Sequence, residues 1–454
     1  MNAPSRKTRN FLLILALAAL GAAACLRLVP LETAAVQKQL LGFPNSDASS
    51  HQARPLILGA LCFLPALAAL LYSLGGTLDR YISRQFLSTF AISISALSVI
   101  WLVFDLSDNL NEFDSAQSLL PSLGTYYFTQ APAVLLLLLP YALLLSLLYS
   151  LGKLSTNREI IAMVQSGRGV VRITLPLLIA GFICSLVTVG LNYHWAPIAE
   201  GRQKEILQSA SGKQVTEATK VLYRNPRNRR LWMIGAFPPN YQYGEALQTV
   251  EVTLINKDHN LSARLTASHA RWNRETGDWS FENPVLAKFS PGTGDPPTYV
   301  KPKSPLVISN WKETPWQLIK PGLSASFLGI PGLNTWLAEN QRQPTLADPA
   351  PYLTHWHYRW ALPFTCLVTV LLATPLAIHF ARRGASGGIF FAVALSALML
   401  ALSTVVLALG EAGILHPVLA AWLPNVSFAL IGCYLYRRRI SGKPIYRSLR
   451  RLLP

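Results

Sequence analysis

A polar stretch between two long apolar runs, Leu151–Gly167, holds the residues best suited to a contact with another protein. Arg158 and Glu159 bring a positive and a negative charge to this stretch. An apolar set follows at helical spacing, made up of Ile160, Ile161, Met163 and Val164. Residues of this kind bind rather than catalyse, because a short helix with apolar anchors can dock in a groove of a partner. A helix that rests on lipid headgroups has the same pattern, so both interpretations stay open.

The ends of this segment predict where a helix begins and ends. Thr156 and Glu159 have the spacing of a capping box, in which each side chain bonds the backbone N–H of the other residue. Gly167 is suited to the left-handed residue that ends a helix. We therefore predict a helix within residues 155–167. Glu159 has two candidate roles: it caps its own helix, or it pairs with a basic residue of a partner.

Residues for bond-breaking chemistry form no recognisable set in the sequence. A phosphate-binding loop needs Gly-Lys followed by Ser or Thr, whereas Lys153, Lys213 and Lys443 are followed by Leu, Gln and Pro. The motifs His-Glu-x-x-His and Gly-x-Ser-x-Gly do not occur. The five cysteines lie in or beside apolar runs, without metal-ligand spacing. We expect no catalytic residues, no cofactor and no metal, and no nucleotide hydrolysis through a phosphate-binding loop.

The composition is that of an α-helical polytopic membrane protein. Of the 454 residues, 51% are hydrophobic and only 14% are charged, with a mean hydropathy of +0.32. Apolar runs near the ~20 residues that a spanning helix requires occur at 11–29, 55–75, 86–106, 131–151, 173–195, 357–380, 388–410 and 418–436. The first run could be a cleaved signal peptide, because Ala22–Cys25 resembles a processing site, but we favour a retained span. Residues 30–54 are expected to form a polar loop.

The basic residues gather beside the apolar runs, so the net charge of +18 does not indicate nucleic acid binding. Lys and Arg number 18 in segments 1–10, 76–85, 153–172, 381–388 and 437–454. Only 2 lie in the alternate segments 30–54, 107–131 and 411–417. The positive-inside rule therefore places both termini and the predicted 155–167 helix in the cytoplasm.

Residues 196–350 change character and predict a soluble, mostly β domain outside the membrane. Strand-like segments are Arg230–Ala236, Leu247–Ile255, Leu261–Trp272 and Trp279–Phe289, and Asn273–Asp278 is typical of a hairpin loop. The apolar residues of the alternating pattern include Trp232, Ile234, Val250, Val252 and Leu254. One apolar face can line an open groove between sheets, and it can equally form the core of a sandwich.

Several motifs, in order along the chain, resemble the lipopolysaccharide export permeases LptF and LptG. They are Leu78-Asp-Arg-Tyr-Ile82, Leu151-Gly-x-Leu154, Arg158-Glu-Ile-Ile-Ala162 with Gly167, Ala267-x-x-Ala-x-Trp272 with Trp279, Arg359-x-x-x-Pro363, Gly413-x-x-x-Pro417 and Ala421-Trp-Leu-Pro-Asn425. The resemblance runs from about residue 77 to residue 437 and does not separate LptF from LptG.

The resemblance implies a six-span permease core with a jelly-roll-like periplasmic domain, in the bacterial inner membrane. It implies a second permease subunit, a cytoplasmic LptB-like ATPase dimer, LptC-like and periplasmic bridge proteins as partners, and lipopolysaccharide or a similar lipid as cargo. The 155–167 helix matches the family's coupling helix, with Glu159 at its acidic position. The acyl chains would pass along Trp232, Ile234, Val250, Val252 and Leu254.

The chain departs from the family pattern in two places. The spans within residues 1–76 are extra to the core, and we expect them to pack peripherally. Family lysines near the outer end of the first core span have no counterpart in Ser107–Gln130, which contains no Lys or Arg.

The sequence thus predicts five parts: 1–76, the extra pair; 77–195, the first half of the core; 196–350, the β domain; 351–437, the second half of the core; and 438–454, a basic tail. A scaffold or receptor that transports nothing, and whose β domain binds a partner across the periplasm, is the alternative function.

Overall fold

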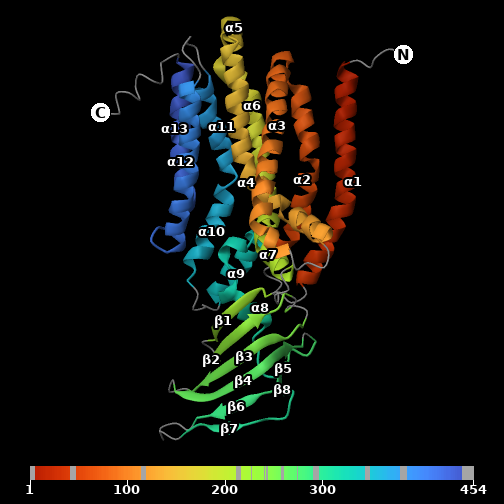
Figure 1. Ribbon diagram of the computed structural model, residues 1–454, viewed down its shortest axis with the longest axis vertical. Coiled ribbons are helices and arrows are strands. Elements are labelled where there is room, and N and C mark those ends of the chain that lie inside the picture. The colour runs from red at the N-terminus through yellow and green to blue at the C-terminus, as the bar shows by residue number, and fades with distance from the viewer. Residues whose placement is uncertain are drawn as a thin grey trace.

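The computed structural model describes residues 6–40, 48–113, 119–210, 216–225, 228–239, 241, 244–256, 260–273, 275–289, 296–342, 348–378 and 386–441. Of the predicted basic tail, residues 442–454 lie outside the described residues, as do 381–385 of the preceding basic segment. Long helices run side by side, and a β insert lies beyond one end of them (Figure 1).

Most of the chain forms long apolar helices. They are α1 (Arg6–Leu40), α2 (Ala48–Leu74), α3 (Thr77–Asn109), α4 (Leu119–Thr156), α6 (Val170–Tyr193), α10 (Ala350–Ala361), α11 (Phe364–Ala377), α12 (Ser386–Glu411) and α13 (Pro417–Ile440). Seven helices of the described part are each long and apolar enough to cross a membrane, and the bent pair α10–α11 brings the total to as many as eight. This agrees with the eight predicted runs and confirms the polytopic helical class.

The expected loop over residues 30–54 is wrong for most of its length. Helix α1 continues to Leu40, and α2 already begins at Ala48. These residues are helical because polar side chains in them are paired within the protein. Arg54 of α2 is buried and forms an ion pair with Glu32 of α1. The two helices are antiparallel, since Gly21 meets Cys62, Gly59 meets Cys25, and Glu32 meets Arg54.

The central core lies between α3, α4, α6 and α11. On α4, buried leucines recur every three or four residues, at Leu143, Leu147, Leu151 and Leu154. They pack with Ile82 and Phe86 of α3 in one cluster. Because this leucine stripe continues to Leu154, α4 remains helical well past the predicted end of its apolar run.

Pro363 breaks the span formed by α10 and α11, which is bent by 51°. A proline has no backbone N–H, so the carbonyl of Arg359 loses its partner within the helix. Asn192 of α6 replaces it: Asn192 Nδ2 donates to the Arg359 carbonyl at 2.7 Å, and Asn192 Oδ1 accepts from Arg359 Nη1 at 3.1 Å. Asn425 of α13 donates to the carbonyl of Ala361 at 2.7 Å. The Arg-x-x-x-Pro and Asn425 motifs therefore stabilise a bent span.

The insert between α6 and α10 contains a sheet of eight antiparallel strands. They are β1 (Ala218–Asn225), β2 (Arg230–Phe237), β3 (Leu247–Ile255), β4 (Leu261–Trp272), β5 (Trp279–Glu282), β6 (Val285–Lys288), β7 (Thr298–Val300) and β8 (Leu306–Ile308). Strands β1 to β4 form a meander, and the sheet forks at β4: its second half pairs with β5, which pairs with β8, and its first half pairs with β6, which pairs with β7.

The sequence predicted β3 and β4 to the residue and the hairpin between β4 and β5, where Trp272 pairs with Trp279. The single predicted strand Trp279–Phe289 is wrong. It divides into β5 and β6 because Asn283 adopts a left-handed conformation, with φ of 51°. Short helices join the insert to the bundle: α7 (Trp195–Ala210) before it, and α8 (Pro315–Ile319) and α9 (Ile330–Arg342) after it.

Candidate functional site

The polar segment singled out by the sequence forms a sharp elbow at the end of the bundle away from the β insert (Figure 1). Its helix α5 (Glu159–Gln165) is shorter than predicted. Asn157 and Arg158 separate it from α4, and Arg158 has a left-handed backbone with φ of 59°. The left-handed residue ends α4, so α5 forms a separate short helix at the end of the bundle (Figure 1).

The predicted capping box is wrong. Thr156 belongs to the last turn of α4, where its Oγ1 donates to the carbonyl of Gly152 at 2.9 Å. No side chain caps the start of α5. The pattern misled because Thr-x-x-Glu spans the end of one helix and the start of the next, and the left-handed residue between them interrupts the continuous geometry that a capping box needs.

Glu159 is held by a different helix. Its Oε2 accepts a hydrogen bond of 2.7 Å from the hydroxyl of Tyr81 in α3, and its Oε1 accepts one of 3.1 Å from Nδ2 of Asn157. Tyr81 belongs to the Leu78–Ile82 motif, so this motif and the acidic residue of α5 form one site. The carboxylate is partly exposed and remains able to meet a cation from outside.

A second contact from the same motif ties down the start of α6 (Val170–Tyr193), the helix after the elbow. Asp79 is buried, and its Oδ2 accepts from the backbone N–H of Gly76 at 3.0 Å and from Nη2 of Arg172 at 2.7 Å. Residues Asp79 and Tyr81 of α3 thus hold both sides of α5. Gly167, with φ of 86°, ends the elbow, and the N–H of Arg168 donates to the carbonyl of Met163 at 3.2 Å.

The apolar residues of α5 do not share one outward face. Ile160 is fully buried in the central core, and Met163 packs against that core. Ile161 is half-buried, and Val164 is 37% exposed. Helix α5 therefore uses Ile160 and Met163 to dock on its own bundle. The outward set consists of Arg158, Ile161 and Val164, beside the carboxylate of Glu159.

The predicted lipid-path residues of the β insert are enclosed. Trp232, Ile234, Val250 and Val252 are fully buried, and Leu254 packs against the same cluster. Aromatic side chains fill the space over them: Trp311 lies 5.2 Å from Trp232 between ring centroids, and Trp279 lies 5.0 Å from it. In this structure the apolar face is the core of the β insert, so a groove along it opens only if the cover moves.

The cover is the segment 311–319, and a buried ion pair fastens it. Glu313 is 1% exposed, and its Oε1 accepts from Arg230 Nε at 2.9 Å and from Asn225 Nδ2 at 2.8 Å. Its backbone carbonyl accepts from Trp279 Nε1 at 2.8 Å. Sequence reasoning missed this pair. The available signal was Arg230, a cation at the start of an apolar strand, and Glu313 between two tryptophans.

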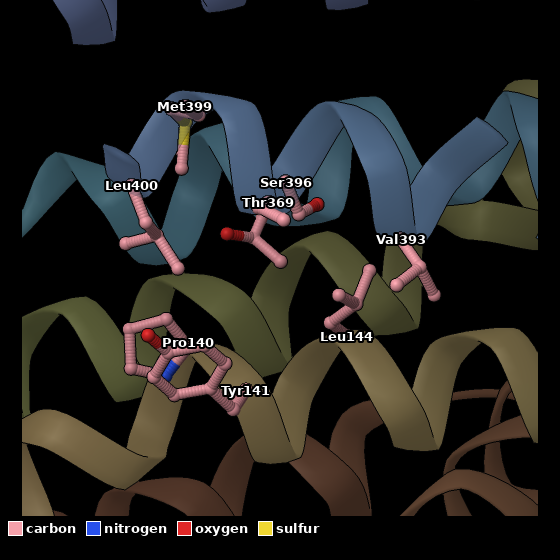
Figure 2. A pocket seen from close by; sticks show the side chains of 9 residues that line it. Pro140, Tyr141, Leu144, Thr369, Val393, Ser396, Met399 and Leu400 are labelled. Atoms are coloured by element: carbon pink, nitrogen blue, oxygen red, sulfur yellow. The ribbon is translucent and has the colours of Figure 1, made fainter. Parts of the chain in front are cut away.

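A small cavity lies in the membrane part, between α4, α11 and α12 (Figure 2). Its volume is about 80 Å³, and its walls are mostly apolar, with Tyr141, Leu144 and Met399 among them. Ligand pockets usually measure about 300–1,000 Å³. The cavity is therefore a packing gap beside Pro140 rather than a site for a whole lipid.

These features define a class of protein: a polytopic membrane protein with a β domain inserted between its spans and a short helix, α5, at the opposite end. The family model described as "Lipopolysaccharide export system permease LptF/LptG" matches residues 80–438. The chain therefore belongs to the LptF/LptG family of lipopolysaccharide export permeases, which are components of a transport system.

Two relatives match the chain at low identity. The lipopolysaccharide export system permease proteins LptG of Escherichia coli strain K12 and of Escherichia coli O6:H1 strain CFT073 are each 22% identical over 376 residues. Each match covers 80% of this chain and 99% of the relative. The family match begins at residue 80. Helices α1 and α2 thus lie outside the part that defines the family.

Proposed function

We propose that this chain is a permease subunit of an ABC-type transporter that extracts lipopolysaccharide, or a related glycolipid, from the inner membrane and passes it toward the outer membrane. A separate LptB-like ATPase dimer would supply the energy. The observation that carries this proposal is the elbow at α5, where Glu159 and Arg158 stand beside exposed apolar side chains on a helix clamped by Tyr81 and by its own core residues.

The contacts that hold α5, from Tyr81 and from the core around Ile160, support a role for α5 in coupling. A helix that merely rested on headgroups would need no rigid link to other spans. Here α5 joins α4 to α6 directly, and its charged end is bonded to α3. A force applied to α5 is therefore transmitted to three core spans at once, because packed helices move as units rather than deforming continuously.

The membrane orientation belongs to the same proposal. The sequence segments expected on the α5 side hold 18 basic residues and the alternate segments hold 2, which supports an orientation with α5 and both termini in the cytoplasm and the β insert in the periplasm. The second permease would pack against the exposed apolar faces of α3 and α12, which carry Val103, Phe104, Leu398 and Val405. LptC-like and periplasmic bridge proteins would receive the lipid from the β insert.

The test is co-purification of an ATPase, combined with photo-crosslinking from α5. A crosslinker at Val164, which points outward, should capture the ATPase, whereas one at Tyr149, which is 62% exposed on the adjacent α4, should not. Capture from neither site, with no ATPase in the purified complex, would favour the scaffold or receptor interpretation.

A further inference from the structure

The α1–α2 pair makes contacts that an appended membrane anchor does not need. The outer end of α2 meets the two places where the chain passes between the bundle and the β insert. One is the corner between α6 and α7, and the other is α9. The chain joins the insert to the spans at these two places, through α7 on one side and through α8 and α9 on the other.

Two hydrogen bonds make these contacts specific. His51 of α2 is buried, and its Nε2 lies 3.2 Å from Oγ1 of Thr335 in α9. The hydroxyl of Tyr193, the last residue of α6, donates to the backbone carbonyl of Ser50 at 2.8 Å. A polar group is costly to bury without a partner, so these bonds fix how the start of α2 faces α9 and the end of α6.

Close packing brings the same three elements together. A Cβ added to Gly190 of α6 would approach the side chain of Leu61 of α2 to 2.4 Å. A Cβ added to Gly329, just before α9, would approach the carbonyl of Tyr193 to 2.6 Å. A side chain at either position would meet these atoms, so Gly190 lets the Leu61 side chain of α2 pack on α6, and Gly329 lets the start of α9 approach the backbone of the α6–α7 corner.

The partner helix α1 strengthens the end of α2. Arg54 lies one turn after His51 and pairs with Glu32 of α1, in a site where both side chains are largely buried. Removal of one member of such a pair leaves a buried charge without compensation, so the pair fixes the register between α1 and α2. Burial lowers the pKa of His194, at the corner, and nearby Arg54 and His51 lower it further. His194 therefore stays neutral and adds no positive charge beside Arg54.

We propose that the α1–α2 pair is a brace for the β insert, in which His51 and Ser50 hold α9 and the α6–α7 corner in fixed positions. His51, Tyr193 and Thr335 are positioning residues, which act by fixing the direction in which the insert extends from the membrane. The proposed positioning of the β insert does not depend on which molecule the protein transports. Its consequence for lipid delivery rests on the proposed function, since delivery requires the insert to face its acceptor.

The first test is hydrogen exchange of the full-length protein in lipid nanodiscs. The double variant Tyr193→Phe/Thr335→Val removes both hydrogen bonds while keeping the side-chain shapes. Amide exchange in α9 and at the start of α7 should become about tenfold faster, while β2, β3 and β4 keep their protection. The matched control, Tyr149→Phe/Thr404→Val, alters exposed side chains of the same types and should leave α9 unchanged. Unchanged exchange in α9 for the first variant would overturn the brace.

A second variant and a second readout separate positioning from general stability. Gly190→Leu should wedge α2 from α6 and speed exchange in α9, and Leu61→Ala in the same chain should restore it. In the reconstituted complex with its ATPase, Tyr193→Phe/Thr335→Val should lower the lipopolysaccharide delivered per ATP several-fold without changing the ATP hydrolysis rate. Equal delivery per ATP would contradict the positioning role, whereas an absence of delivery by the wild-type protein would instead refute the proposed function.

Discussion

Tyr81 and Glu159 are 78 residues apart in sequence, yet the Tyr81 hydroxyl donates a 2.7 Å hydrogen bond to the Glu159 carboxylate. This bond joins the first span of the family core to the short helix α5. It gives Glu159 a structural role that differs from capping its own helix. It also makes the Leu78–Ile82 motif part of the proposed coupling site, because Asp79 in the same turn holds Arg172 at the start of α6.

A double-mutant cycle tests the link between these two residues. Tyr81→Phe removes only the hydroxyl and should weaken ATPase binding several-fold, because Glu159 loses the bond that orients it. A hydrogen bond of this kind contributes about 1 kcal/mol. In a chain that already carries Glu159→Ala, Tyr81→Phe should have no further effect on ATPase affinity. Additive losses in the two variants would show that Tyr81 acts independently of Glu159.

Helix α5 should respond differently to the loss of inward and outward side chains. Ile160→Ala removes a fully buried side chain and should lower the free energy of unfolding by about 2–5 kcal/mol. Val164→Ala, on the exposed side, should leave the unfolding temperature nearly unchanged and weaken ATPase binding. The measurements are thermal unfolding in detergent and affinity for the purified ATPase. A large loss of stability from Val164→Ala, with normal ATPase binding, would contradict the placement of Val164 on the outward side of α5.

The buried ion pair of the β insert should matter far more than an exposed one. Glu313→Gln leaves Arg230 buried without a countercharge, and we expect a loss of about 3–5 kcal/mol in the stability of the insert. The control is Glu251→Gln, which breaks the more exposed pair with Arg264, where about 0–1 kcal/mol is expected. Tryptophan fluorescence during unfolding reports on both, because Trp232, Trp279 and Trp311 pack around this site. Similar losses in the two variants would contradict the proposed fastening of the cover.

The orientation can be checked by labelling in intact cells, after replacement of the exposed Cys433. An impermeant maleimide should label a cysteine at Glu275, in the turn between β4 and β5, if the insert lies in the periplasm as proposed. It should label a cysteine at Ser441, after α13, only once the inner membrane is permeabilised. Labelling of Ser441→Cys alone would invert the topology.

Local patterns were sufficient to predict most elements. Eight apolar runs, the strands Leu247–Ile255 and Leu261–Trp272, and the hairpin between Trp272 and Trp279 follow from periodicity and turn chemistry, which depend on neighbouring residues. The errors arose where distant residues decide the outcome. Residues 30–40 are helical although the sequence there predicts a polar loop, and Glu32 pairs with Arg54 of the next helix.

The candidate site shows the same division between features that follow from local sequence and features that depend on distant residues. The sequence located the segment that forms α5, but not which way its side chains point. Ile160 turns inward because α3, α4 and α6 supply a core for it, and no property of residues 151–167 alone shows that core. The left-handed Arg158 and the partner Tyr81 were likewise beyond local pattern, since each depends on how α4 and α3 pack.

We expect the charge of Glu159 to connect the permease to its ATPase. ATP-driven release of lipopolysaccharide from proteoliposomes containing the wild-type, Glu159→Gln or Glu159→Ala chain tests this connection most directly. The Gln amide oxygen can still accept the Tyr81 hydrogen bond, whereas the bond from Asn157 Nδ2 is lost in Glu159→Gln as in Glu159→Ala. Glu159→Gln therefore removes the charge while keeping the link to α3. We predict that Glu159→Gln impairs release nearly as much as Glu159→Ala, with normal insertion and folding. Release by Glu159→Gln at the wild-type rate would contradict the claim and would move the coupling contact to Arg158, Ile161 and Val164.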